Sequence, residues 1–203
     1  MNSERPPDAS SVAGLVLAAG KSSRMGRDKA LLPFRGSTFL EAILGVLHGA
    51  GLVRIAVVLG HHAGLIERSA DLSGVEVVYN PDYEQGQTSS LQAGLRALER
   101  PDLEAVLLAL VDHPAISEET VQTLIAEFLE SHAPVVIPTH EGRRGHPLII
   151  ARKLFEPLLD LSLDQGANSI VRDYRESTLF VEVEDPGILL DVDEPESLAA
   201  LGQ

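Results

Sequence analysis

The stretch VAGLVLAAGKSSRMGRDK, residues 12–29, decides how the rest of the chain is interpreted. Its first part is a short apolar run, long enough for a strand that is buried on both faces of a parallel sheet. The side chains then become very small at Ala18-Ala19-Gly20, where a ligand can approach the backbone and N–H groups can form an anion-binding concavity. Cationic residues follow at once: Lys21, Arg24, Arg27 and Lys29. This combination predicts a site for a polyphosphate.

Two well-known phosphate loops do not fit the same stretch. A Walker A loop needs a glycine where this chain has Leu15. The dinucleotide-binding fingerprint needs three glycines at a fixed spacing, and within residues 12–29 only Gly20 and Gly26 follow the strand. Both loops are therefore excluded by residue type.

Residues 17–29 resemble the LAAGxSxRMGxxK signature of nucleotidyltransferases, especially the MobA/MocA-like enzymes of molybdenum cofactor biosynthesis. The resemblance implies that this loop binds the nucleotide, and that Arg24 and Lys29 are catalytic because they hold the triphosphate. The residues implied to bind the nucleotide here are Leu17, Ala18, Ala19, Gly20, Lys21, Ser22, Ser23, Arg24 and Lys29.

Composition limits the other classes of function. The formal net charge of −14 argues against binding to nucleic acid and makes the basic loop conspicuous. The absence of cysteine excludes disulfides and thiolate chemistry and is compatible with the cytoplasm, where we expect the protein to act. The first residues lack the apolar core of a signal peptide, and no apolar run approaches the length needed to span a membrane.

The order of predicted elements indicates an α/β fold. After a helix at 38–50, with Ser37 as N-cap and Gly51 just beyond its end, strands are expected at 53–59, 75–79 and 105–111. Helices are expected at 65–70, at 88–98 and after Ser117. We place the most apolar strand, 105–111, at the centre. This alternation predicts a three-layer αβα arrangement with a mostly parallel sheet, Rossmann-like (GT-A-type) in its nucleotide-binding half.

The second half of the chain is less regular. Strands at 135–138 and 146–150 are expected to form a hairpin, followed by helices at 153–160 and 169–174, a strand at 179–183 and a helix from about 194. We interpret this part as an acceptor-binding elaboration, without a second domain. The predicted organisation is a disordered tail at 1–11 and a single nucleotidyltransferase domain at 12–203.

Two acidic segments are candidates for a metal site. Asp112 directly follows the central strand, where a carboxylate is costly to desolvate unless it is paired or binds a cation. The resemblance extends to this D-x-P turn and to residues 191–196, which resemble the family motif DxDTPEDL. It implies that Asp112 is catalytic, that Asp112 and Asp193 bind Mg²⁺, and that Asp191 either orients the metal ligands or has a structural role. Ordinary capping of a turn or a helix is the alternative for both segments.

Polar residues near the third strand are candidates for contacts to the nucleoside. Asn80-Pro81 and residues 86–94 resemble the family segment NPxxxxGxxxSLxxG, which implies that Asn80, Ser89 and Ser90 bind the nucleoside. Amide and hydroxyl groups are suited to reading the edge of a base. An Asx-turn and an N-cap would account for the same residues.

The candidates for acceptor binding lie in the second half. Gly145-His146-Pro147 matches the family's GHP element, which implies that His146 is near the acceptor, and Arg143 and Arg144 could meet a phosphate on it. Residues 164–168 resemble the family's GDxGAR stretch, with Asn168 in place of the arginine.

The pair His61-His62 raises the question of a zinc site. Adjacent residues of a strand point to opposite faces, so we expect these histidines to be a poor pair of ligands. The sequence also lacks cysteines and an H-x-x-x-H spacing.

The resemblance covers residues 12–201 and implies an Mg²⁺-dependent nucleotidyltransferase that converts NTP and a phosphorylated acceptor to nucleotidyl-acceptor and pyrophosphate. Ala19 stands where cytidylyl-transferring relatives carry alanine and guanylyl-transferring ones carry glycine, which favours CTP with molybdopterin as acceptor. A molybdoenzyme is an implied protein partner. The alternatives are a sugar- or alditol-phosphate nucleotidyltransferase, a non-catalytic nucleotide-binding accessory protein for a molybdoenzyme, and a sugar-transferring enzyme of similar fold.

Overall fold

The computed structural model describes residues 9–21, 28–163 and 165–192. One central sheet has the strand order β10-β7-β9-β6-β1-β4-β5, with β8 paired to β7. Its strands are β1 (Val12–Ala18), β4 (Ile55–Leu59), β5 (Glu76–Tyr79), β6 (Ala105–Leu110), β7 (Val135–His140), β8 (Arg143–Arg144), β9 (Leu148–Ala151) and β10 (Leu179–Glu182). The strand predicted to be central, β6, lies in the middle of this order.

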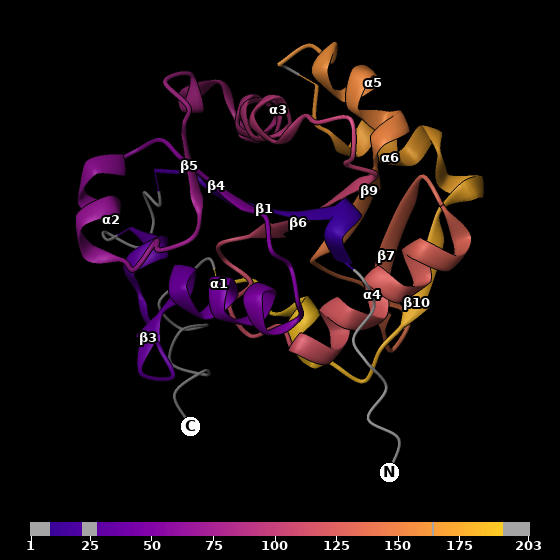
Figure 1. Ribbon diagram of the computed structural model, residues 1–203, viewed down its shortest axis with the longest axis horizontal. Helices are drawn as coiled ribbons and strands as arrows, with labels where there is room; N and C mark the ends of the chain where they lie inside the picture. Colours follow the sequence, from indigo (N-terminus) through magenta and orange to yellow (C-terminus); the bar gives the residue numbers. More distant parts are fainter. Residues whose placement is uncertain (1–8, 22–27, 164, 193–203) are drawn as a thin grey trace.

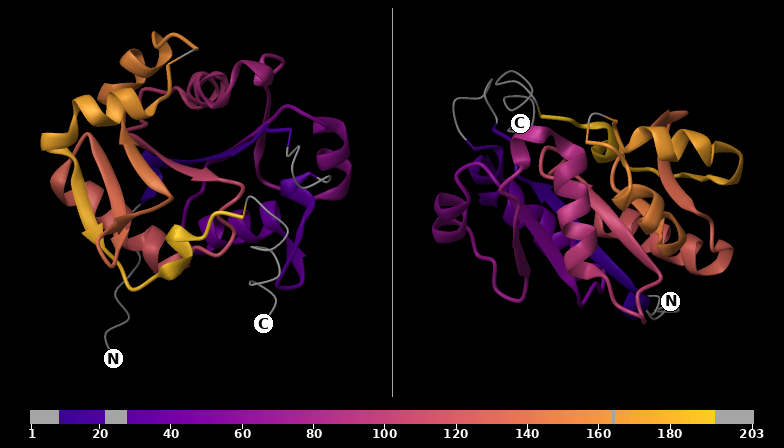
Figure 2. Two further views of the ribbon diagram at one scale, coloured as in Figure 1. Left: turned by 180° about the vertical axis from the view of Figure 1, so that it is seen from behind. Right: turned by 90° about the horizontal axis from the view of Figure 1, so that it is seen from above.

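Helices cover both faces of this sheet (Figures 1 and 2). Figure 1 shows α3 (Gln87–Leu98), α5 (Phe155–Leu159) and α6 (Asn168–Asp173) on one face, and α1 (Phe39–Gly49) and α4 (Glu118–Ser131) on the other. The short helix α2 (Ala63–Ser69) lies at the end of the sheet near β5. The predicted three-layer αβα class is confirmed.

Strand β1 separates the two large hydrophobic cores, which lie on opposite faces of the sheet. All of its residues are buried, and they alternate between the two helical layers. Val12 and Val16 belong to the core under α1 and α4, whereas Ala13, Leu15 and Leu17 belong to the core under α3 and α5. Since a strand buried on both faces has no polar side, its sequence reads as a continuous apolar run.

The two halves of the sheet differ in strand direction. Strands β5, β4, β1 and β6 pair in parallel. Strand β9 then lies antiparallel between β6 and β7, while β10 is parallel to β7. The predicted antiparallel pairing of 135–138 with 146–150 is therefore confirmed, although β9 begins at Leu148 and β7 extends to His140.

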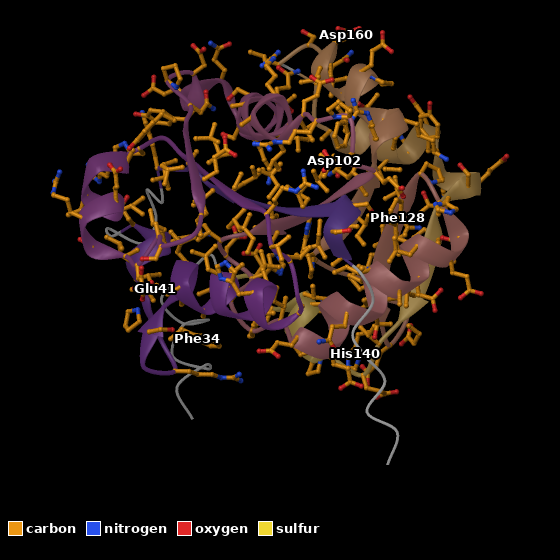
Figure 3. All side chains as sticks on the ribbon, in the orientation of Figure 1. Phe34, Glu41, Asp102, Phe128, His140 and Asp160 are labelled. Carbon is orange, nitrogen blue, oxygen red and sulfur yellow. The ribbon has the colours of Figure 1, made fainter. Side chains whose placement is uncertain are left out.

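The start of α1 differs from the prediction. The N-cap is Thr38, whose hydroxyl accepts a hydrogen bond from the Glu41 N–H, while the Glu41 side chain accepts one from the Thr38 N–H. Ser37 instead belongs to a small hairpin of β2 (Pro33–Phe34) and β3 (Ser37–Thr38), which the sequence analysis did not anticipate. Figure 3 shows Phe34 and Glu41 close to this hairpin.

The described part of the chain also starts earlier than the tail boundary expected at residue 11. Ala9–Ser11 forms a 3-10 turn, and Ala9 is buried in the core under α1 and α4. The helix expected from residue 194 lies outside the described residues. None of the helices in the described ranges has the length and apolar character needed to cross a membrane.

Candidate functional site

The carboxyl ends of the parallel strands bring the predicted loops to one edge of the sheet. The His61 N–H donates to the Ala19 carbonyl at 3.1 Å, which joins the turn after β4 to the loop after β1. On the other side of β1, the Val111 N–H donates to the Leu17 carbonyl at 3.2 Å. The turns after β4 and β6 therefore flank the start of the small-residue loop, as expected for a ligand site of a parallel sheet.

At this edge Lys29 and Asp112 form an ion pair. Lys29 begins the 3-10 turn Lys29–Leu31, and its ammonium Nζ lies 3.2 Å from Asp112 Oδ2. The Lys29 side chain is 10% exposed and that of Asp112 is 25% exposed. Such a pair sits in a medium of lower dielectric than water, where charge interactions are strong. The predicted catalytic residues Lys29 and Asp112 are therefore brought into direct contact.

The second oxygen of Asp112 fits a cation. Oδ1 is buried without a hydrogen-bond partner among the described residues. One ligand atom from each of Asp112, His113 and Asp191 lies within 4.8 Å of the others. The Val192 N–H also donates to the Asp112 carbonyl at 3.0 Å, which fixes the strand end against the C-terminal segment. A buried carboxylate oxygen without a hydrogen bond, beside a second carboxylate, is a suitable donor set for a divalent cation.

His113 was not among the predicted site residues. It is buried, and its Nε2 lies 3.9 Å from Asp112 Oδ1. Its Nδ1 has no hydrogen-bond partner among the described residues. The sequence feature that could have identified His113 is its position directly after Asp112, at the end of an apolar strand.

His146 faces the same centre from the second half of the chain. Its ring lies 5.2 Å from that of His113, centroid to centroid. Burial, and after it the positive charge that His113 can carry, lowers the pKa of His146 to about 4, against the opposing influence of Asp112. His146 is therefore a neutral imidazole at pH 7, and its buried Nδ1 has no hydrogen-bond partner in the described part of the chain.

A mostly apolar pocket with a cavity volume of about 80 Å³ opens beside His146. Its polar lining residues are His146, Gln87 and Asn168, and its aliphatic walls come mainly from β6, β9, α3, α5 and α6. The stretch that resembles the family's GDxGAR segment thus borders the same pocket as His146. Gly145 permits the approach of the chain here, because a Cβ would lie 2.3 Å from the Ile188 carbonyl oxygen.

Two cationic residues that were predicted to bind substrate phosphates, Lys21 and Arg144, contact other side chains of the protein. Lys21 is an exposed residue that forms an ion pair with Glu84, which raises the pKa of its ammonium group. Arg144 is exposed on β8 and stacks its guanidinium over the Phe180 ring at 4.5 Å. In the described part of the chain, these two side chains therefore have Glu84 and Phe180 as partners instead of the Lys29–Asp112 pair.

The predicted nucleoside contacts are buried and bonded to one another. The Asn80 amide donates to Ser89 Oγ at 2.9 Å and to Ser90 Oγ at 3.0 Å, and its Oδ1 accepts from the Asp82 N–H. Ser89 also donates to the Gly86 carbonyl. In this geometry the three side chains support the turn that leads into α3.

Four predicted site residues lie outside the described residues. Ser22, Ser23 and Arg24 belong to the loop between residues 21 and 28, and Asp193 follows the last described residue. Their expected roles stay predictions.

The geometry expected for His61 and His62 is wrong. The two residues follow β4 in a turn, and His62 has a left-handed backbone with φ 51°. Their rings therefore lie together, 3.8 Å apart, instead of on opposite faces. His62 Nδ1 lies 3.0 Å from Asp28 Oδ2, and ligand atoms of the three residues lie within 4.8 Å of one another.

The fold is the GT-A-like fold of nucleotidyltransferases, as its structural neighbours show. The sequence pattern of the MobA-like NTP transferase domain matches residues 14–178. The chain belongs to this family, and it is an enzyme of the nucleotidyltransferase type.

Individual relatives carry different names. Nicotine blue oxidoreductase of Paenarthrobacter nicotinovorans is 33% identical, over 96% of this chain and 98% of that one. Molybdenum cofactor cytidylyltransferase of Escherichia coli K12 is 31% identical, over 90% and 91%. A probable molybdenum cofactor guanylyltransferase of Bacillus cytotoxicus is 32% identical, over 68% and 67%.

Solved structures agree with this assignment. The crystal structure of Rv0371c from Mycobacterium tuberculosis H37Rv has a TM-score of 0.83 at 30% identity, covering 95% of this chain and 98% of that one. The same mycobacterial protein has been solved in complex with manganese, and that structure has a TM-score of 0.80.

Proposed function

We propose that this enzyme is a cytoplasmic CTP:molybdopterin cytidylyltransferase that uses Mg²⁺ and forms molybdopterin cytosine dinucleotide and pyrophosphate. The observation that carries the proposal is the Lys29–Asp112 pair, whose second carboxylate oxygen is buried without a hydrogen bond. A cation placed at the end of a central parallel strand, beside a small-residue loop, is suited to nucleotide phosphates.

The reaction needs no protein nucleophile. An oxygen of the acceptor phosphate attacks the α-phosphorus of CTP in line, the bond to the β-phosphate bridging oxygen breaks, and pyrophosphate leaves. The work of the chain is then to position the two substrates and to neutralise charge. We assign the second task to Lys29, and the support is that its ammonium group lies against Asp112 at the carboxyl edge of the sheet.

A bound Mg²⁺ would supply charge neutralisation at the reacting phosphate. Asp112 Oδ1, in the turn after β6, is the proposed first ligand, and Asp191 or Asp193 is the second carboxylate. Ligand atoms of Asp191, Asp112 and His113 lie within 4.8 Å of one another, which supports Asp191. The family resemblance of residues 191–196 is what supports Asp193. Arg24, Lys29 and the backbone of residues 18–23 are proposed to hold the triphosphate.

The pocket beside His146 is proposed to take the ring system of the acceptor. Its aliphatic walls suit a flat heterocycle, and Gln87 and Asn168 can meet polar edges of such a ring. His146 enters this pocket as a neutral imidazole, which can both donate and accept a hydrogen bond. Since Arg144 stacks on Phe180, we propose that it has at most a peripheral role.

The nucleotide preference rests on Ala19, which is 4% exposed. A methyl group at a base pocket discriminates by roughly 1–3 kcal/mol, so GTP should bind more weakly and still measurably. The name of the oxidoreductase relative does not alter the proposal, because the glycines of a dinucleotide fingerprint are absent and the Lys29–Asp112 pair suits phosphate chemistry.

The test is thermal unfolding with CTP, GTP, ATP and UTP, each with and without Mg²⁺, followed by an assay of pyrophosphate release with molybdopterin. A ligand at about a hundred times its Kd adds roughly 2.7 kcal/mol, a clear shift of the midpoint. We expect an Mg²⁺-dependent preference for CTP that is lost in Asp112→Asn and retained in Lys21→Ala. A preference for another nucleotide would overturn the assignment of CTP and molybdopterin as substrates but keep the class of enzyme. Absence of any shift would overturn the whole proposal. Nucleotide binding without pyrophosphate release would instead indicate a non-catalytic accessory protein, and release with a sugar or alditol phosphate would identify the other type of acceptor.

A further inference from the structure

A second polar cluster lies at the carboxyl edge of β4 and is not used by the proposed reaction. Its members are Asp28, His61 and His62. The side chain of Asp28 is 9% exposed and that of His62 is 55% exposed, so a buried carboxylate faces a ring that solvent can reach. His62 Nδ1 lies 3.0 Å from Asp28 Oδ2.

The backbone around this cluster is held on several sides. A Cβ on Gly60 would lie 2.8 Å from the Ala19 carbonyl oxygen, and the His61 N–H donates to that same oxygen at 3.1 Å. His62 then adopts φ 51° and starts α2. A non-glycine residue with a left-handed backbone is unfavourable, and such strain persists where the surrounding structure fixes it.

His61 is also oriented through one ring nitrogen. Its Nδ1 lies 3.4 Å from the Tyr83 hydroxyl, and its ring lies 3.8 Å from that of His62. An imidazole that is fixed through one nitrogen presents the other to a ligand, which is the usual arrangement of metal-binding histidines.

We propose that Asp28, His61 and His62 form a divalent-cation site of the Zn²⁺, Co²⁺ or Ni²⁺ class, separate from the Asp112 centre. Imidazole nitrogens select such ions, whereas Mg²⁺ prefers oxygen ligands. Two imidazoles and one carboxylate complete three positions of a tetrahedral ion and leave one for water or a further ligand. One divalent ion would also satisfy all three side chains at once.

A cation at this site would also affect the residues that follow Asp28 in the sequence. Asp28 directly precedes Lys29, the partner of Asp112. A cation held by Asp28 and the two histidines would tie the start of the turn Lys29–Leu31 to the turn between β4 and α2.

The test is a titration of the full chain with Zn²⁺ against a chromophoric zinc chelator, without nucleotide. The Asp112→Asn protein is used as background, so that the cluster of Asp112, His113 and Asp191 does not contribute. Onto it are placed Asp28→Asn, His61→Gln and His62→Asn. Asparagine tolerates the left-handed backbone of residue 62. The matched control is His132→Asn, because His132 is an exposed histidine with φ 49° at the end of α4.

We expect one equivalent of Zn²⁺ to bind to the background protein and to the His132→Asn control. Loss of a ligand should weaken binding by at least 10- to 100-fold, on the order seen when only a supporting partner of a metal ligand is removed. Co²⁺ should give an absorption band that disappears in the same variants. Unchanged Zn²⁺ affinity in folded His61→Gln and His62→Asn proteins, checked by circular dichroism, would overturn the proposal. Absence of binding to the background protein would overturn it as well. Neither result bears on nucleotide transfer, because no substrate is present.

Discussion

The parallel half of the sheet, β5-β4-β1-β6, and the mixed half, β9, β7, β10 and β8, are built in different ways. In the parallel half, strands and helices alternate, and polar residues collect at one edge because every strand ends there. In the mixed half, distant segments hold one another: Thr139 donates to Glu182, and the His146 N–H donates to the Ile188 carbonyl. In the proposed function, the phosphate chemistry therefore belongs to the regular half, whereas the proposed acceptor pocket lies where the two halves meet.

The largest effect is expected from breaking the contact that anchors the regular half, with Lys29→Met. Methionine retains the apolar stem and removes the charge. Loss of one preorganised charge-stabilising donor costs on the order of 10²–10³ in kcat, so pyrophosphate release should fall by that factor. The control is Lys21→Met, which removes an exposed ammonium group paired with Glu84 and should change the rate only a few-fold. Equal effects of both substitutions would contradict the assignment.

The second prediction concerns protonation at the seam between the halves. The pKa of His146 is lowered to about 4, below the usual 6.5, so the folded protein binds this proton less readily than the unfolded chain. The contribution of this pKa difference to the free energy of unfolding is fully present above pH 6.5 and is lost as the pH falls from about 6.5 toward 4. It amounts to roughly 3 kcal/mol at most.

Urea unfolding between pH 4 and 7 measures this effect, and NMR titration of the imidazole measures the pKa itself. His146→Gln should flatten the pH dependence of stability in this window. The exposed His48→Gln variant should leave it unchanged. Titration of His146 near pH 6.5 would contradict the burial argument.

A third prediction tests how the halves are joined. Gln92 on α3 is buried, and its amide donates to the Leu158 carbonyl at 2.9 Å and to the Leu161 carbonyl at 2.8 Å. Removal of these donors leaves buried carbonyl groups unpaired, at a cost of about 1–3 kcal/mol.

We expect Gln92→Ala to lower the free energy of unfolding by that amount and to increase amide exchange at α5 and α6 more than in the parallel strands. Gln85→Ala is the control, since Gln85 is exposed and its side-chain amide donates to the nearby Asp82 carboxylate. Uniform loss of protection across the sheet would show that α5 and α6 do not depend on this link.

The sequence was informative about the fold where contacts are local or periodic. The apolar run of β1 predicts a strand buried on both faces, and the helix after Ser117 begins where its cap predicts, with the Ser117 hydroxyl accepting from the Thr120 N–H. The position of β9 between β6 and β7 has no local signal. It depends on pairings between residues far apart in the chain, such as Leu107 with Ile149.

The same division applies to the candidate site. Lys29 and Asp112 follow from a motif and from the rule that strand ends meet at one edge. The contact between His61 and His62 cannot be predicted from the sequence in this way. The alternation of side chains along β4 ends at Leu59, and the left-handed backbone of His62 turns its ring toward His61. The stacking of Arg144 on Phe180 similarly depends on how β10 lies in the sheet, which residue type alone does not determine.

The smallest effect tests a local detail of the parallel half, the start of α1. Thr38 Oγ1 accepts from the Glu41 N–H at 3.3 Å and donates to the Glu41 carboxylate at 2.8 Å, whereas the Ser37 hydroxyl donates to the Phe34 carbonyl in the hairpin. Thr38→Ala should therefore lower the free energy of unfolding by about 1 kcal/mol, the usual cost of losing an N-cap. Ser37→Ala should cost clearly less, because its bond lies in an open turn. The reverse order in urea unfolding would return the cap to Ser37 and show that the hairpin does not fix where α1 begins.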